Sequence, residues 1–247
     1  MVQVIILAGG KGTRMKSTQS KVLTPVRGVS MIERVLRAVT PICNRPGVII
    51  GFGGEEVRKI VGDRVEYILQ TEQLGTGHAV LQAREKFDRP DISEIVVLYG
   101  DHPLISEETV RSLIAAHASK PGTVITMATI RVPDFAGPWV IFERFGRILR
   151  NPQGEVCGIR EWKDATEKER EIHEVNPGYY CFNAQWLWEN IDSLKNENAS
   201  YEYYLTDLVS LAVRDGKSIE AMFVKDPHEG MGVNTQEELV IAEQYAK

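Results

Sequence analysis

Cysteine is scarce in this 247-residue sequence, and its spacing excludes two ways of stabilising a small domain. The three cysteines, Cys43, Cys157 and Cys181, form no C-x-x-C pair. Neither a disulfide framework nor a cysteine-based zinc site is therefore expected, and we predict buried or idle thiols in a reducing cytoplasm. A chain of this length buries roughly 70 to 75% of its unfolded surface, which makes such cross-links unnecessary.

The sequence also has no long apolar run and no block of basic residues. No stretch approaches the roughly 20 apolar residues that span a bilayer, and no basic region precedes the short apolar run at the N-terminus. The net charge of −5 and the pI of about 5.7 argue against a nucleic-acid partner. We expect a cytoplasmic protein that binds small molecules through local loops, with no nucleic-acid or membrane partner.

Apolar runs of strand length recur along the first half of the chain, at 2–8, 48–50, 95–98 and 124–127. Continuous apolar character is typical of strands buried on both faces of a parallel sheet. Helical patterns lie between the runs: Ser30 to Glu33 has the spacing of a capping box, and 104–118 has acidic residues in its first turn. This alternation predicts an α/β fold with a mostly parallel, Rossmann-like doubly wound sheet.

The pattern changes after residue 127. Turn residues and aromatics fill 131–146, and a charged segment follows at 161–174. We predict one domain over 1–247, made of a main part (1–127), a smaller lobe with the returning chain (128–234) and a C-terminal helix (235–247). Ligands of such sheets bind beyond the carboxyl ends of the strands, so the loops after Ala8 and Tyr99 are the places to search.

The loop after the first strand, LAGGKGTR at 7–14, has the outline of a phosphate-binding loop. It matches neither the P-loop nor the dinucleotide fingerprint. Small residues let a backbone approach a ligand closely, and successive N–H groups can form an anion-binding nest. Arg14 and Lys21 add two cations suited to a phosphate chain. The glycines alone are equally typical of a turn with surface cations, so the prediction depends on segments downstream.

Two downstream segments extend the candidate site. Asp101 directly follows a strand, where a carboxylate facing a triphosphate is a natural Mg²⁺ ligand; capping of the turn is the alternative. In QTEQLGTGHA, 70–79, small residues open a helix beside Gln73, whose amide can read the edge of a pyrimidine. We predict that His102 faces solvent rather than a metal, because no second histidine or cysteine lies at ligand spacing.

Ordered motifs then reveal a resemblance over nearly the whole chain. The motifs are LAGGKGTRM, SKVL, QTEQLGTGHAV, LYGDHPL, FGRILR, EWKDAT, EVNPGYY, EYYLTDLV and GVNTQEEL. The chain resembles the N-acetylglucosamine-1-phosphate uridyltransferase domain of the bacterial bifunctional uridyltransferase/acetyltransferase, a branch of the sugar-1-phosphate nucleotidyltransferases. The resemblance implies a nucleotide-diphospho-sugar transferase fold with a small sugar-binding lobe. It also implies Mg²⁺-dependent synthesis of UDP-N-acetylglucosamine and pyrophosphate from UTP and N-acetylglucosamine-1-phosphate.

The resemblance further implies roles for individual residues. The nucleotide would be held by Leu7, Ala8, Gly9, Gly10, Gly12, Thr13, Gln73, Gly75 and Thr76. Arg14 and Lys21 would be the catalytic cations on the phosphates, and Asp101 and Asn234 would bind Mg²⁺. The amino-sugar pocket would be lined by Tyr99, Gly146, Glu161, Asn176 and Tyr203. Such a transfer needs no nucleophilic side chain, because positioning and charge neutralisation carry the catalysis.

Four features depart from the family's pattern. Ser20 stands where the family has proline, Gly9 replaces an alanine, and Pro177 replaces a threonine beside Asn176. Residues 136–143 form an insertion that we expect beside the sugar pocket. The insertion and Pro177 leave open another acceptor, glucose-1-phosphate or a different sugar-1-phosphate, with UTP or dTTP. A catalytically silent nucleotide-sugar sensor or assembly module is a third interpretation.

One difference beyond these four concerns the end of the chain. The sequence stops at Lys247 without the hexapeptide-repeat acetyltransferase half of the bifunctional enzyme. It is therefore interpreted as either a free-standing uridyltransferase or an excised domain. Without the trimerising repeat, a monomer or weak homodimer is expected.

Overall fold

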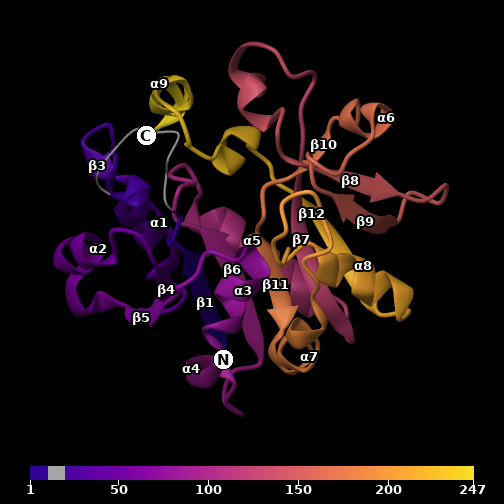
Figure 1. Cartoon of the computed structure of the whole chain (residues 1–247), viewed down its shortest axis with the longest axis horizontal. Helices are drawn as coiled ribbons and strands as arrows, with labels where there is room; N and C mark the ends of the chain where they lie inside the picture. The colour runs from indigo at the N-terminus through magenta and orange to yellow at the C-terminus, as the bar shows by residue number, and fades with distance from the viewer. Residues whose placement is uncertain (11–19) are drawn as a thin grey trace.

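The computed structural model describes residues 1–10 and 20–247. One half of its main sheet consists of four parallel strands in the order β5–β4–β1–β6 (Figure 1). Their bounds are Val2–Leu7 for β1, Gly47–Ile50 for β4, Glu66–Leu69 for β5 and Glu94–Tyr99 for β6. Val4, Ile5 and Ile6 of β1 are fully buried, as expected of a strand covered on both faces. The predicted largely parallel, Rossmann-like sheet is confirmed.

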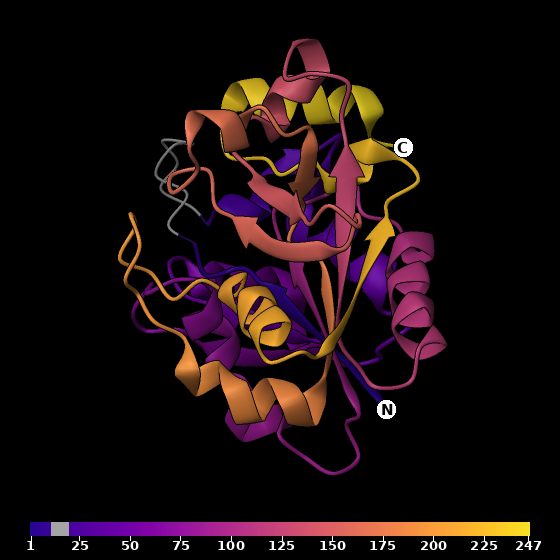
Figure 2. The ribbon, with the colours of Figure 1, turned by 90° about the vertical axis from the view of Figure 1, so that its right-hand side faces the viewer.

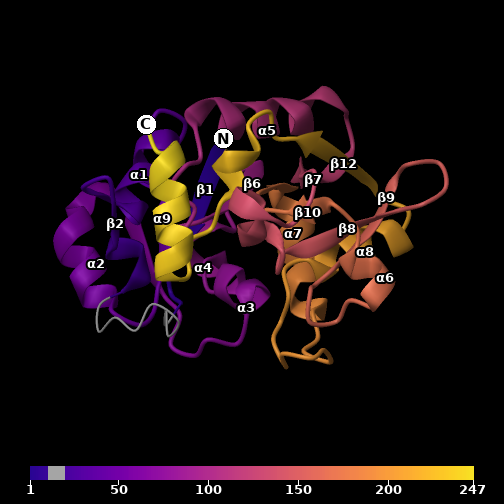
Figure 3. The same ribbon diagram turned by 90° about the horizontal axis from the view of Figure 1, so that it is seen from above.

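Helices cover both faces of this sheet. They are α1 Met31–Val39, α2 Gly54–Val61, α3 Thr76–Leu81, α4 Arg84–Phe87, α5 Glu107–Ser119, α7 Ala184–Asn190 and α8 Asp207–Arg214. Val4 and Ile6 pack in one hydrophobic core with α1 and α5, whereas Ile5 packs in a second core with α3, α7 and α8. Figure 3 shows the two groups of helices on opposite sides of the strands. Successive side chains of β1 point to opposite faces of the sheet, so this strand contributes to both hydrophobic cores.

The second half of the chain extends the same sheet. Its strands are β7 Thr123–Arg131, β8 Gly146–Arg150, β9 Val156–Arg160, β10 Glu174–Asn176, β11 Tyr180–Asn183 and β12 Ser218–Phe223. β11 lies antiparallel between β6 and β7, and β12 pairs parallel to β7. Figure 2 shows β12 beside α5, and β8 to β10 with α6 (Glu167–Arg170) in the lobe. Because β7 crosses residue 127, the main part and the lobe share a strand.

The C-terminal helix α9, Gln236–Tyr245, returns to the start of the chain. It packs near β2 (Pro25–Val26), which pairs with β3 (Val29–Ser30), and Figure 3 shows α9 beside β2. Thr235 caps α9, because its side chain accepts from the Glu238 N–H in a full capping box. The capping box predicted at Ser30 is wrong: Ser30 precedes α1, but its side chain makes no capping hydrogen bond.

Short 3-10 turns connect these elements, at η2 Lys21–Leu23, η3 Gly62–Arg64, η4 Gly137–Phe142, η5 Ile191–Ser193 and η6 Pro227–Gly230. Cys43 and Cys181 are buried as predicted, whereas Cys157 is exposed. Across residues 1–10 and 20–247, no helix has the length and apolar character that crossing a membrane requires.

Candidate active site

A pocket of about 240 Å³ opens at the carboxyl ends of the parallel strands. The strand order reverses at β1, because β4 lies on one side of it and β6 on the other. Doubly wound sheets bind ligands at such a topological switch point. The predicted residues that line the pocket are Leu7, Ala8, Gly9, Gly10, Lys21, Gln73, Gly75, Thr76, Tyr99 and Asp101. The other residues predicted on the first loop, Gly12, Thr13 and Arg14, lie outside the described residues.

Lys21 joins the two predicted metal ligands. Its ammonium group forms a salt bridge with Asp101 Oδ2 and donates a hydrogen bond to Asn234 Oδ1 at 2.7 Å. The Lys21 and Asp101 side chains are only 11% and 15% exposed. Burial by itself would raise the pKa of Asp101, but the neighbouring ammonium outweighs it, and the pKa of Asp101 lies below its ordinary value. Asp101 is therefore an ionised carboxylate at the pocket's edge.

His102 lies behind this cluster, and the prediction that it faces solvent is wrong. Its ring is buried and stacks on Tyr99 with centroids 5.3 Å apart. The Tyr179 hydroxyl donates to the Glu229 carbonyl at 2.8 Å, so His102 Nδ1, 2.9 Å from that hydroxyl, is the donor in their contact. Burial lowers the pKa of His102 to about 4. The returning chain covers the ring, since a side chain at Gly232 would begin 2.6 Å from Nε2.

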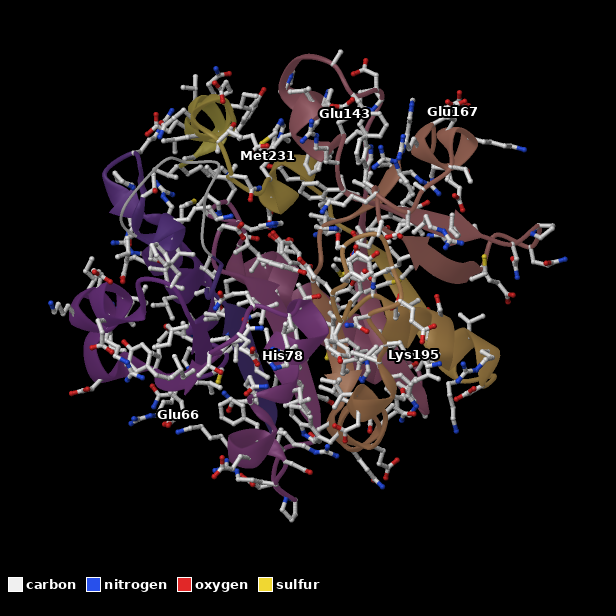
Figure 4. The ribbon with its side chains drawn as sticks, in the orientation of Figure 1. Glu66, His78, Glu143, Glu167, Lys195 and Met231 are labelled. Atoms are coloured by element: carbon white, nitrogen blue, oxygen red, sulfur yellow. The ribbon has the colours of Figure 1, made fainter. Side chains whose placement is uncertain are left out.

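Two glutamine amides line the same pocket as Lys21. Gln70 Nε2 donates to the Gly75 carbonyl at 3.2 Å and lies 3.1 Å from His78 Nδ1. Figure 4 labels His78, which lies on α3. Gln73 Nε2 donates to the Gln70 carbonyl at 3.3 Å. Amide groups fixed in this way suit a neutral ring with donors and acceptors, such as a nucleobase.

Gln70 and Glu202 line the pocket although neither was predicted. A side chain at Gly9 would begin 3.3 Å from Gln70 Oε1, so Gln70 also explains the small residue on the first loop. Gln70 directly follows β5, and the positional rule that selected Asp101 after its strand would have selected Gln70 too. Glu202 lies in a loop segment with no comparable signal in the sequence.

The segment around Tyr203 supports the pocket through its backbone. The Tyr203 N–H donates to the Leu74 carbonyl at 2.8 Å, and its carbonyl accepts from the Gly77 N–H at 2.8 Å. Gly75 has φ of +113°, and a side chain there would begin 2.6 Å from the Tyr203 carbonyl oxygen, so only glycine fits. The Tyr203 ring instead lines a separate pocket with Leu74 and Leu194. The structure does not bring this predicted side chain into the main pocket.

Glu161 and Gly146 adjoin each other in the lobe. Thr206 Oγ1 donates to Glu161 Oε1 at 3.0 Å, and a side chain at Gly146 would begin 3.5 Å from either carboxylate oxygen. Burial raises the pKa of Glu161 to about 6, although the hydrogen bond from Thr206 opposes the shift. A carboxylate so poorly solvated retains acceptor capacity that a polar ligand can use.

Asn176 fixes the turn at Gly178, and this turn packs against the Tyr99 ring. Its Nδ2 donates to the Tyr180 hydroxyl at 2.7 Å, and its Oδ1 accepts from the Gly178 N–H at 3.0 Å. Gly178 has φ of +82°, and a side chain there would begin 2.2 Å from the Tyr99 ring. Asn176 is itself buried, so it acts on the pocket wall by holding this turn against Tyr99.

The insertion packs against residues late in the chain, apart from the pocket at the carboxyl ends of the strands. None of 136–143 lines that pocket. Trp139 stacks on His228 with centroids 4.9 Å apart, and His228 stacks on Tyr245 of α9 at 3.8 Å. Pro177 lies near Gly230, where an added side chain would begin 3.1 Å from the proline ring. Through these aromatic contacts the insertion connects the lobe to α9.

Asp101 and Asn234 fit Mg²⁺ by the chemistry of their donors. Mg²⁺ prefers oxygen ligands and is commonly held by one or two protein groups together with substrate phosphates and water. An ionised carboxylate and an amide oxygen converge here on one cation, the Lys21 ammonium. Within the described ranges, no group of three or more His, Cys, Asp or Glu side chains forms an all-protein metal cage.

A larger cavity lies at the other end of β1 and is a poorer candidate. It measures about 810 Å³ and is lined by Val2, Gln3, Phe87 and Ile114 among others. Its walls are mainly apolar, with cations that already pair with Glu66 or other carboxylates. The cluster of cation, carboxylate and amides occurs at the carboxyl ends of the strands, so the smaller pocket is the candidate active site.

Comparison with known proteins identifies the family of the chain. Residues 4–176 match the family described as the MobA-like NTP transferase domain. The matched segment contains most of β1, the first loop, Gln73, Asp101 and Asn176.

Curated relatives and one solved structure extend the similarity to the rest of the chain. Bifunctional protein GlmU of Streptococcus agalactiae is 41% identical over 240 residues, 97% of this chain and 50% of that protein. Bifunctional protein GlmU of Brevibacillus brevis is 40% identical over 247 residues, 100% of this chain and 52% of that protein. The chain thus spans about half the length of the curated relatives it matches. A Bacillus anthracis protein assigned as a glucose-1-phosphate thymidylyltransferase, solved with sucrose, shares the fold with a TM-score of 0.74 at 19% identity, covering 100% of this chain and 95% of that one.

Proposed function

The chain belongs to the MobA-like NTP transferase domain family and is a nucleotidyltransferase, and from this premise we propose its substrates. We propose that it transfers a uridylyl group from UTP to N-acetylglucosamine-1-phosphate and releases pyrophosphate. The observation that carries the proposal is the division of the pocket. Lys21 and Asp101, with Asn234 hydrogen-bonded to Lys21, form a charged end, whereas Gln70 and Gln73 provide amide groups at the other end. Phosphates suit the first end and a pyrimidine base suits the second.

The reaction is a single in-line displacement at phosphorus. A phosphate oxygen of the sugar-1-phosphate forms a bond to the α-phosphorus of UTP. The bond from that phosphorus to the bridging oxygen of the β-phosphate breaks, and pyrophosphate leaves with the electron pair. Charge accumulates on the phosphate oxygens, so the protein's task is to hold both substrates in line and to neutralise that charge.

Lys21 and the oxygen pair provide that neutralisation. The Lys21 ammonium, a compact point charge on a flexible stem, would contact a phosphate oxygen. Asp101 and Asn234 would hold Mg²⁺, which when bound supplies positive charge on the phosphates. Arg14, outside the described residues, is proposed as the second phosphate cation. No side chain has to be acylated or phosphorylated in this scheme.

The acceptor sugar is proposed to lie against the lobe. Glu161 offers a carboxylate that accepts hydrogen bonds from sugar hydroxyls, and its burial makes such bonds strong. Tyr99, fixed between His102 and Gly178, is proposed as the wall that the sugar ring contacts. Gly146 leaves room beside Glu161 because it lacks a side chain. The similarity to proteins named GlmU supports N-acetylglucosamine-1-phosphate as the acceptor.

A pyrophosphate-release assay over a panel of nucleotides and sugar-1-phosphates tests the proposal. We expect the highest kcat/KM with UTP and N-acetylglucosamine-1-phosphate, and none without a divalent cation. Preference for glucose-1-phosphate, or for dTTP, would replace the proposed substrates and keep the chemistry. Binding of a nucleotide sugar in a calorimeter without turnover of any pair would instead identify a silent sensor.

A further inference from the structure

One ammonium group lies where two cation-binding oxygens converge. Lys21 Nζ contacts Asp101 Oδ2 and Asn234 Oδ1 together, the second at 2.7 Å. The three residues come from separate parts of the chain, since Lys21 is 80 residues from Asp101 and 213 from Asn234. Contacts of such long range place the two oxygens together only in the folded protein.

The backbones that carry the two oxygens are joined by hydrogen bonds that do not involve Lys21. The N–H of Val233, next to Asn234, donates to the Asp101 carbonyl at 2.9 Å. The N–H of Asn234 donates to a carboxylate oxygen of Glu238, in the first turn of α9. The two segments therefore stay in register whatever the lysine side chain does.

Lys21 combines a fixed backbone with a long, unbranched side chain. Its carbonyl accepts from the Thr24 N–H at 3.0 Å, and the η2 turn is closed by a 3.0 Å bond from Leu23 to Ser20. The side chain is an unbranched four-carbon stem that can rotate away without moving the turn. The ammonium can thus leave the oxygens and reach a phosphate in the same pocket.

We propose that Lys21 occupies the Mg²⁺ position of the metal-free protein, so that the ammonium and the metal exclude each other at Asp101 and Asn234. The inference rests on the proposed function, in which this pair binds Mg²⁺. Mg²⁺ must approach each oxygen to about 2.0–2.1 Å, inside the space that the ammonium fills. The ammonium and Mg²⁺ are both positive, and two like charges at such a short distance repel strongly at a partly buried site. A nucleotide resolves the conflict, because it brings the metal for the oxygens and a phosphate for the lysine.

Metal binding without nucleotide provides the test. Mn²⁺ is titrated into the wild type and Lys21→Met and followed by electron paramagnetic resonance, with Lys59→Met as control. Lys59 is exposed on α2, so its loss changes the net charge equally. We expect Lys21→Met to bind Mn²⁺ at least about fivefold more tightly than the wild type, within the usual range of coupling between sites. The control should match the wild type.

Two further measurements separate direct exclusion from a general effect of charge. Without metal, Lys21→Met should melt at a lower temperature than the wild type, because Asp101 loses its partner, and Mg²⁺ should restore more of its stability than it adds to the wild type. The second measurement uses the wild type and therefore avoids any effect of a substitution. The ¹⁵N resonance of the Lys21 ammonium should move when Mg²⁺ is added. That resonance is assigned through bonds from the Lys21 backbone.

The outcomes are distinct. Equal Mn²⁺ affinity in all three proteins, with an unmoved Lys21 resonance, would overturn the exclusion. Absence of metal binding at the pair, with pyrophosphate release intact, would also overturn it and leave the transfer reaction standing. Failure of the transfer reaction itself appears in the substrate panel, which is independent of these titrations.

Discussion

Thr206 Oγ1 donates a hydrogen bond to Glu161 Oε1 at 3.0 Å, which joins the residue before α8 to the residue after β9. The bond stabilises the ionised carboxylate, yet burial outweighs it and raises the pKa of Glu161 to about 6 from an ordinary value of 4.5. A carboxylate kept in poor contact with water is a common feature of binding and catalytic pockets. It also makes the protein's stability depend on pH.

Glu161→Gln should therefore stabilise the protein at high pH and not at low pH. At pH 4.5 the carboxyl group is protonated in the folded chain and half protonated in the unfolded chain, so its contribution is close to its most favourable value there. As the pH rises through about 6 that contribution is lost, and the loss reaches about 2 kcal/mol because one pKa unit is worth about 1.4 kcal/mol. Glutamine keeps an acceptor for Thr206 without titrating. Urea unfolding at pH 4.5 and 8 measures the difference, and a gain that is the same at both values would contradict the buried-carboxylate account.

Ser20→Pro should be tolerated and mildly stabilising. Ser20 has φ of −56°, which proline can adopt, and its buried hydroxyl has no hydrogen-bond partner among the described residues. Proline restricts the unfolded chain, so we expect a gain of about 0.4–1 kcal/mol in the free energy of unfolding. Ser20→Ala, which removes the hydroxyl without adding a ring, is the control. A proline variant less stable than the alanine variant would show that the Ser20 N–H or the space near Gly53 matters more.

Gln73→Ala should weaken nucleotide binding with little change in kcat. Loss of one hydrogen bond to a neutral base removes about 0.5–1.5 kcal/mol, which raises KM for UTP up to about tenfold. Steady-state kinetics at saturating sugar-1-phosphate give the value. Gln185→Ala, on the exposed surface of α7, should leave KM unchanged. An unaltered KM for UTP in the Gln73 variant would place the base elsewhere in the pocket.

Asp101→Asn should abolish most turnover while the fold survives. Asparagine keeps the shape of the side chain but removes the charge that would hold Mg²⁺, so we expect kcat to fall by at least about 100-fold, as for loss of a major electrostatic group. Higher Mg²⁺ should recover part of the rate. Circular dichroism checks the fold, and Asp63→Asn, exposed in η3, serves as the matched control. Turnover close to the wild type would show that the metal binds other oxygens.

Local pattern predicted much of the sheet and part of the site. Continuous apolar runs identified β1, β4, β6 and β7, because strands buried on both faces need no polar positions. Lys21, Gln73 and Asp101 were placed in one pocket by their position after strands or at helix openings. Those features are encoded within a few neighbouring residues.

Contacts between distant segments account for what the pattern missed. His102 is buried because the chain near Gly232 folds over it. The residues next to His102 in the sequence give no sign of this contact. The Tyr203 ring turns toward Leu194 while its backbone supports Gly75, a division that residue type cannot reveal. The 136–143 insertion meets His228 and thereby α9, so its role depended on a partner late in the chain.

The most direct test of the central claim follows the sugar's phosphate atom by atom. N-acetylglucosamine-1-phosphate labelled with ¹⁸O in its non-bridging phosphate oxygens is incubated with UTP, Mg²⁺ and the protein, and the products are weighed by mass spectrometry. The account predicts UDP-N-acetylglucosamine that carries all of the label, and pyrophosphate that carries none. Label in pyrophosphate, or no labelled nucleotide sugar at all, would contradict uridylyl transfer to this acceptor.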